Sequence, residues 1–163
     1  MTAFFNADEV LAMAERIERN GQGFYLRAAS MVQGTDTGKL LADLAVWEKG
    51  HEALFKAMRE DLSKREREST AFDPFDEIVL YLQSMADSHV FATDDIDPAS
   101  LLDGSESDED ILDAALEFER NSMLFFMGLQ RVVSESLGKE KVWKIIDEET
   151  SHIAWLEKKR QGL

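Results

Sequence analysis

The chain has 163 residues and a formal net charge of −15, which excludes nucleic acids and anionic membranes as its main partners. It contains no cysteine, so disulfides, thiolate zinc sites, iron–sulfur clusters and a rubredoxin-type module are excluded, and any metal must take oxygen and nitrogen ligands. The length suits one domain over residues 1–163, and a content of only two prolines favours long helices. Because no apolar run is long enough to span a bilayer and the first residues lack a signal-peptide pattern, we expect a cytoplasmic location.

The first part of the chain predicts a hairpin of two helices. Asn6 and Glu9 match a capping box, and apolar residues then recur at helical spacing, which predicts a first helix from about 7 to 32. Gly34 and the Thr-Asp-Thr run after it predict a turn. A second periodic face follows and predicts a helix that reaches the region 64–66. Because the turn is short, we expect the two helices to pack antiparallel.

The middle of the chain predicts a crossover between two hairpins. Pro74 and the apolar run from Ile78 to Met85 predict a short helix from about 75 to 89. The segment 94–110 is dense in acidic residues and turn formers, which predicts a solvated loop, with attraction of iron as the alternative. A connection of this length would also allow the two hairpins to exchange between protomers.

The last part of the chain predicts a second hairpin. Ser107 is suited to cap a third helix that continues to about 136, and Gly138 ends it before a fourth helix. The predicted fold is therefore all-α, a four-helix bundle of two duplicated hairpins with a long crossover that contains a short extra helix. The predicted segments are hairpin one at about 7–66, the crossover at about 67–106 and hairpin two at about 107–160.

A duplicated pattern relates the two hairpins at a constant offset of 101 residues. In each hairpin, a glutamate precedes a Glu-x-x-His pair by 30 residues. The six residues are Glu18, Glu48 and His51 in the first hairpin, and Glu119, Glu149 and His152 in the second. Residues three apart share a helix face, so four helices would bring four carboxylates and two imidazoles together. That is the ligand set of a carboxylate-bridged dinuclear metal site in a helix bundle.

The four glutamates of this pattern follow apolar residues at helical spacing, so their carboxylates are predicted to face the core. Unpaired carboxylates are costly there, and two divalent cations would cancel the four negative charges. A single Glu-x-x-His pair would usually mark a solvated face, and a duplicated pattern can outlast the loss of its metal. All six positions keep ligand-type side chains, which favours the dinuclear site. His89 lacks a glutamate three residues before it and is interpreted as a structural or surface histidine.

Over nearly its whole length outside the crossover, the chain resembles the rubrerythrin branch of the ferritin-like superfamily. The residues that carry the resemblance are Glu18 with Phe24-Tyr25, Glu48 with His51, Glu119 with Phe125-Phe126, and Glu149 with His152. The resemblance implies two iron ions, bridged by Glu48 and Glu149 and held further by the other four residues of the pattern. Manganese or zinc at one or both positions is the alternative.

Two features depart from the rubrerythrin pattern. Rubrerythrins proper carry a rubredoxin domain, which this cysteine-free chain lacks, so electrons would have to come from a separate donor protein. They also place an extra glutamate one turn after the third-helix ligand, and the residue here is Ser122. That glutamate is the residue to which the family's iron shift on reduction is attributed.

The first functional hypothesis is a redox enzyme in which two ferrous ions reduce hydrogen peroxide, or oxygen, and are then re-reduced by the donor protein. Carboxylate ligands suit this chemistry because hard oxygen donors stabilise the ferric product. Tyr25, on the same helix face as Glu18, is interpreted either as a hydrogen-bond donor to a metal ligand or to bound peroxide, or as a core aromatic residue.

Two other functional hypotheses use the same residues. One is ferrous oxidation for iron storage or detoxification, and the other is a structural bundle that binds metal without turnover. A peroxidase predicts a homodimer or small homo-oligomer with about two irons per chain, whereas storage predicts a large closed shell. We expect no nucleic-acid or membrane partner in any of these cases.

Overall fold

The computed structural model describes residues 7–64, 67, 77–88, 97–133, 135 and 138–162. Within these residues every regular element is a helix, which confirms the predicted all-α class. The elements are α1 (Ala7–Met31), α2 (Asp36–Glu60), α4 (Glu77–Ser88), the 3-10 helix η2 (Pro98–Leu101), α5 (Asp108–Val132) and α6 (Lys139–Gln161).

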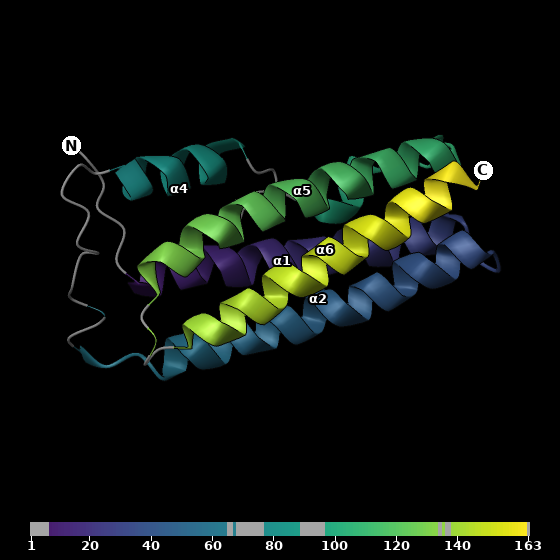
Figure 1. Ribbon diagram of the computed structural model, residues 1–163. Coiled ribbons are helices and arrows are strands. Elements are labelled where there is room, and N and C mark those ends of the chain that lie inside the picture. Colours follow the sequence, from purple (N-terminus) through teal and green to yellow (C-terminus); the bar gives the residue numbers. More distant parts are fainter. Residues whose placement is uncertain are drawn as a thin grey trace.

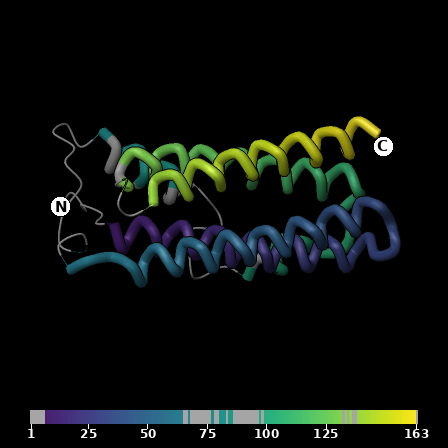
Figure 2. The backbone as a smooth tube through the Cα atoms, turned by 60° about the horizontal axis from the view of Figure 1, so that its bottom comes forward, coloured from purple at the N-terminus to yellow at the C-terminus, as the bar shows by residue number. Residues whose placement is uncertain are grey.

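The four long helices form a bundle of two hairpins, α1 with α2 and α5 with α6. In Figure 1, α1 and α6 run in one direction along the bundle, and α2 and α5 run in the opposite direction. α2 ends at one end of the bundle and α5 begins at the other, so the connection between the hairpins has to cover its length (Figures 1 and 2). This is the long crossover that the sequence predicts, and its helix α4 packs against α5.

Local signals in the sequence set the starts of α2 and α5. Gly34 has a φ of 81°, a left-handed conformation that glycine adopts without strain, and it reverses the chain after α1. Thr35 then caps α2, because its Oγ1 accepts a hydrogen bond from the N–H of Gly38 at 3.0 Å. At α5, Ser107 and Asp110 form a reciprocal capping box, so the predicted cap at Ser107 is present.

Two helices end earlier than their periodicity predicts. α2 ends at Glu60 rather than near 64–66, and α5 ends at Val132 rather than near 136. Leu62 and Val133 lie within two residues of these ends, and both are buried in one apolar cluster, so the chain leaves each helix while it still contributes to the core. Other predictions rest on residues outside the described part of the chain, namely Asn6, Pro74, His89 and residues 94–96.

The prediction of a solvated loop over residues 94–110 was wrong for part of that segment. Pro98–Leu101 form η2, and Leu102 directly after it is only 5% exposed. Leu102 belongs to the same apolar cluster as Phe24 of α1. Acidic residues dominate the composition of the segment. Burial of the adjacent Leu101 and Leu102 nevertheless stabilises the protein by more free energy than it costs to hold the acidic residues near the bundle. The segment is therefore partly anchored on the bundle.

Two apolar clusters fill the bundle, one toward each end. The first includes Val10, Ile17, Phe55, Phe126 and Ile146. The second includes Phe24, Leu41, Leu44, Leu112 and Leu156. Each of the four long helices contributes to both clusters, and on each helix the residues of the duplicated pattern lie between the two contributions. The core therefore consists of two apolar regions with a polar layer between them.

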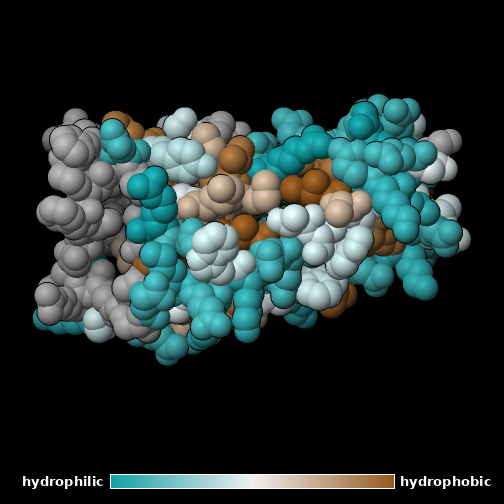
Figure 3. Space-filling view, in the orientation of Figure 1, coloured by the Kyte–Doolittle hydropathy of each residue, from teal (hydrophilic) through white to brown (hydrophobic). Residues whose placement is uncertain are grey.

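The surface of the bundle is mostly hydrophilic, as expected for amphipathic helices. In Figure 3, hydrophilic side chains cover most of the visible face, and apolar side chains are exposed near its middle. The large apolar side chains exposed on α5 and α6 are Leu124, Met127, Trp143 and Trp155. No helix in the described residues is long and apolar enough to cross a membrane.

Candidate metal centre

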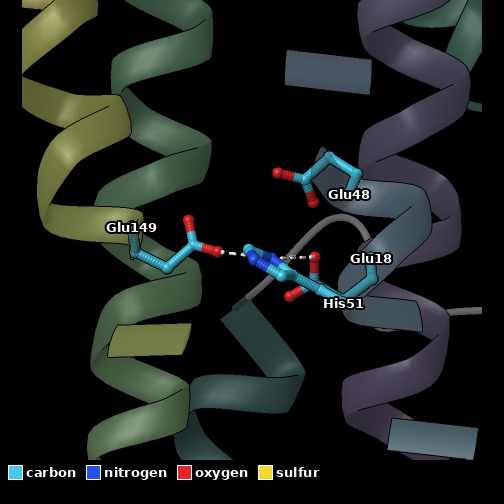
Figure 4. Close-up of side chains that lie close together, drawn as sticks. All are labelled: Glu18, Glu48, His51 and Glu149. Carbon is cyan, nitrogen blue, oxygen red and sulfur yellow. Dashed lines mark hydrogen bonds and ion pairs between the residues drawn. The ribbon is translucent and has the colours of Figure 1, made fainter. Parts of the chain in front are cut away.

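The polar layer between the apolar clusters contains all six residues of the duplicated pattern. α1 carries Glu18, α2 carries Glu48 and His51, α5 carries Glu119, and α6 carries Glu149 and His152. Each of the six is 5% exposed or less. Figure 4 shows four of them, from three helices, turned toward the same interior space. Helix periodicity and pairing of the hairpins thus bring together the residues that the sequence singles out.

The six side chains form two overlapping groups of potential metal ligands. In each group, one ligand atom from every residue lies within 4.8 Å of those of the others. The first group is Glu18, Glu48, His51 and Glu149, and the second is Glu48, Glu119, Glu149 and His152. Glu48 and Glu149 belong to both groups. Because a carboxylate has two oxygens, each of these glutamates is placed to contact a cation in either group.

The two histidines lie on facing helices and direct the same ring nitrogen into the layer. His51 Nδ1 lies 3.1 Å from Glu149 Oε1 and 3.3 Å from Glu18 Oε2. His152 Nδ1 lies 3.5 Å from an oxygen of Glu119 and 3.5 Å from an oxygen of Glu149. The two imidazole rings are nearly parallel, with centroids 5.8 Å apart. Each group therefore contains one imidazole nitrogen among its carboxylate oxygens.

Several buried polar atoms in the layer have no hydrogen-bond partner within the part of the chain that the structure describes. They are Glu18 Oε1, both carboxylate oxygens of Glu149 and both ring nitrogens of His152. Buried polar groups are normally hydrogen-bonded, so this concentration of atoms with ion-pair contacts at most and no hydrogen bond needs an explanation. The atoms are oxygen and imidazole donors, the types that bind divalent transition metals. The residues present therefore fit a cation-binding centre.

The carboxylates of the layer are shifted in pKa by burial and by one another. Burial, and then the charges of neighbouring glutamates, raises the pKa of Glu18 and Glu48 well above the ordinary value. The same causes raise the pKa of Glu119 to about 8. Burial also raises the pKa of Glu149, but its contacts with Glu119 and both histidines outweigh burial and lower it below the ordinary value. Glu149 is thus the carboxylate that stays ionised without a metal.

The pKa values of both histidines are raised, so the imidazoles keep their protons to higher pH. Burial lowers the pKa of each imidazole, but contacts with glutamates outweigh burial. Contact with Glu149 raises the pKa of His51 to about 9, and contacts with Glu119 and Glu149 raise that of His152 to about 10. Without metal, the layer therefore keeps protons on its histidines and on Glu119 at neutral pH. A cation that binds there has to displace them.

Tyr25 and Gly21 of α1 lie against the layer. The Tyr25 hydroxyl, which is fully buried, donates a hydrogen bond of 2.5 Å to Glu119 Oε1. Gly21 lies beside the carboxylate of Glu48, and a Cβ at this position would be 2.9 Å from Glu48 Oε2. Sequence reasoning singled out Tyr25 but did not recognise the role of Gly21. The available signal was a glycine inside a helix, one turn after Glu18, where it costs helix stability.

Glu148 is a second residue that sequence reasoning missed. Its Oε2 lies 2.6 Å from His51 Nε2, the ring nitrogen that faces away from the layer. Glu148 directly precedes Glu149 on α6, so its side chain leaves the helix on a different side. The contact depends on how closely α2 and α6 approach, which no local pattern encodes.

No protein-family model matches the chain, and no curated protein matches it significantly. Among solved structures, the chain is similar to a candidate ferritin-like diiron-carboxylate protein from Thermotoga maritima. The two share 21% sequence identity with a TM-score of 0.76, and the match covers 99% of this chain and 98% of the other. The likeness confirms the predicted ferritin-like fold. It does not distinguish the rubrerythrin branch, which stays a prediction.

Proposed function

We propose that this chain is a di-iron carboxylate protein that reduces hydrogen peroxide, or oxygen, with electrons from a separate donor protein. The observation that carries the proposal is the overlap of two buried ligand groups in Glu48 and Glu149. Four carboxylates and two imidazoles fit two divalent cations in both charge and donor type. Support for iron comes from the resemblance to rubrerythrins and from the Thermotoga maritima protein of the same fold, whose name describes a diiron-carboxylate protein.

Two ferrous ions held by these residues would supply the two electrons that, with two protons, convert one hydrogen peroxide into two waters. The hard carboxylate oxygens favour this direction because they stabilise ferric over ferrous iron. Tyr25 contacts the proposed metal ligands through its hydrogen bond to Glu119. Burial raises the pKa of Tyr25 well above its ordinary value, so the hydroxyl keeps its proton and its hydrogen bond fixes the orientation of the Glu119 carboxylate.

A small cavity lies next to the layer. Its volume is about 10 Å³, enough for roughly one water-sized molecule. The residues that line it are Ile17, Gly21, Tyr25, Glu48, Phe118, Glu119 and Ser122. A cavity of this size leaves no room for an organic substrate at this point of the layer. It also places Glu48, Glu119 and the Tyr25 hydroxyl next to the space that the oxidant would enter.

The acidic segment before α5 offers little support for an iron-collecting function. Glu106 accepts hydrogen bonds from the backbone N–H groups of Asp103 and Gly104 at 2.9 and 3.0 Å. Asp110 accepts from the N–H of Ser107 at 3.0 Å. These carboxylates therefore satisfy backbone groups of their own segment, which favours a structural role and makes storage the weaker candidate.

The proposal is tested by loading the purified full chain with ferrous iron without oxygen and then titrating it with hydrogen peroxide. We expect about two irons per chain and oxidation by about one equivalent of peroxide per site, faster than by air. Turnover should stop after one cycle unless an external reductant is added. Zinc or manganese as the metal retained from cells, or slow oxidation without stoichiometry, would contradict the redox proposal. Hundreds of irons retained per assembly after repeated additions in air would favour storage.

A further inference from the structure

The two halves of the metal centre differ at the residue that precedes each shared glutamate. In the first hairpin this residue is Trp47, before Glu48, and in the second it is Glu148, before Glu149. The two positions are related by the same offset of 101 residues as the ligands. In a symmetric pair of hairpins, each should therefore lie over the histidine of the opposite half. The structure shows this placement for both residues, with different consequences for the two histidines.

Both ring nitrogens of His51 contact carboxylates. Its Nδ1 faces Glu18 and Glu149 in the layer, and its Nε2 lies 2.6 Å from Glu148 Oε2. A carboxylate can only accept this hydrogen bond, so Nε2 carries the proton. In the neutral imidazole, Nδ1 then presents its lone pair to the layer, as a metal ligand must. Glu148 thus selects the ring tautomer that can bind metal, and it fixes the orientation of the ring.

His152 has no such support. Its Nε2 is buried and has no hydrogen-bond partner among the described residues, and besides His51 the rings next to the imidazole are those of Trp47 and Trp155. The Trp47 ring meets the imidazole edge to face, with centroids 5.8 Å apart. An indole N–H can only donate, so tryptophan offers no acceptor to a proton on Nε2. Within the described residues, no carboxylate therefore accepts a hydrogen bond from the outer nitrogen Nε2 of His152, and its tautomer is not fixed from that side.

We infer that the two metal positions are inequivalent and that Glu148 is the positioning residue that makes them so. The position that contains His51 binds a divalent cation first and more tightly, and the position that contains His152 fills second. A carboxylate behind a ligating histidine orients the ring and strengthens it as a donor, and loss of such a partner costs about 10- to 100-fold in metal affinity. The inference rests on the dinuclear site proposed above and adds an order of filling to it.

The test is an anaerobic titration of the metal-free full chain with Co²⁺, followed by absorbance and by calorimetry. For the wild type we expect two binding steps of unequal affinity. The His51→Ala variant should lose the tighter step and His152→Ala the weaker one, which assigns the steps. Glu148→Ala should weaken the tighter step by about 10- to 100-fold and leave the weaker step unchanged. Glu148→Gln, whose amide oxygen still accepts the hydrogen bond but carries no charge, should fall between wild type and Glu148→Ala.

A matched control and a converse variant sharpen this experiment. Asp147→Asn removes one negative charge from the exposed side of the same helix and should leave both steps unchanged. Trp47→Glu should give His152 an acceptor and tighten the weaker step. Circular dichroism and melting curves of the metal-free variants establish that each is folded before it is titrated.

Two outcomes overturn the inference in different ways. Two equal steps in the wild type, or an unchanged tighter step in Glu148→Ala, would reject the role of Glu148 and leave the dinuclear site intact. In that case the contact between Glu148 and His51 would serve only the packing of α2 against α6. Failure of the wild type to bind two cations would instead reject the proposed function, and the inference with it.

Discussion

Replacement of Gly21 by alanine should raise the stability of the metal-free bundle and lower its affinity for metal. The new Cβ would lie 2.9 Å from Glu48 Oε2, whereas ordinary contacts begin at 3.4 Å, so the carboxylate has to move by about 0.5 Å. In the metal-free protein this carboxylate is the end of a flexible side chain and moves at little cost. The helix then gains roughly 0.8–1 kcal/mol from alanine, which raises the melting temperature by about 2–4 °C.

The same substitution should weaken metal binding. When Glu48 ligates metal, its oxygen is held to within about 0.2 Å of the ideal distance, so a displacement of about 0.5 Å is not tolerated. Crowding of this kind costs roughly 1–3 kcal/mol, which corresponds to a loss of about 5- to 150-fold in affinity. The measurements are melting curves of the metal-free protein and Co²⁺ titration of both steps, because Glu48 belongs to both ligand groups.

Gly50 provides the matched control for Gly21. It lies within α2 between Glu48 and His51, but a Cβ there would meet no atom within 4 Å. Gly50→Ala should therefore raise the melting temperature as much as Gly21→Ala and leave metal affinity unchanged. Wild-type affinity in Gly21→Ala would refute the reasoning that this glycine makes room for a ligating carboxylate. Equal losses of affinity in both variants would show that the effect comes from helix propensity and not from the contact with Glu48.

Three further predictions concern the ligands, their protons and the tyrosine. Glu149→Ala should remain helical by circular dichroism and lose both metals in the Co²⁺ titration, because Glu149 belongs to both ligand groups. The metal-free protein should become less stable from about pH 4.5 to pH 10 in thermal melts. Raised pKa values of about 8 for Glu119, 9 for His51 and 10 for His152 mean that the folded state binds more protons than the unfolded state, and this stabilisation is lost as pH rises through those values. Bound metal should remove most of that dependence and raise the melting temperature, since it takes the place of the protons; an equal slope with and without metal would contradict this. Tyr25→Phe should lower the free energy of unfolding in urea by roughly 1–3 kcal/mol, because Glu119 Oε1 loses a buried hydrogen bond, and an unchanged unfolding midpoint would show that this bond is not needed.

The sequence by itself determined the helices and the six residues that meet in the polar layer. Apolar periodicity and capping residues such as Ser107 place the four long helices, because these signals act within one or two turns of the chain. The Glu-x-x-His pairs put Glu48 with His51, and Glu149 with His152, on common faces for the same reason. The offset of 101 residues then predicted that both hairpins contribute equally to one layer. The structure brings those six residues together.

Only the tertiary structure decided the features that depend on distances between helices. Leu62, after the end of α2, and Leu102, after η2, are buried in apolar clusters to which several helices contribute. The clearance between Gly21 and Glu48 and the contact of Glu148 with His51 are set by how closely α1, α2 and α6 approach one another. Local patterns carry the period of a helix but not the separation of two helices. The duplicated pattern therefore predicts a symmetric site, and the packing of the helices decides that the differing residues Glu148 and Trp47 lie against its two histidines.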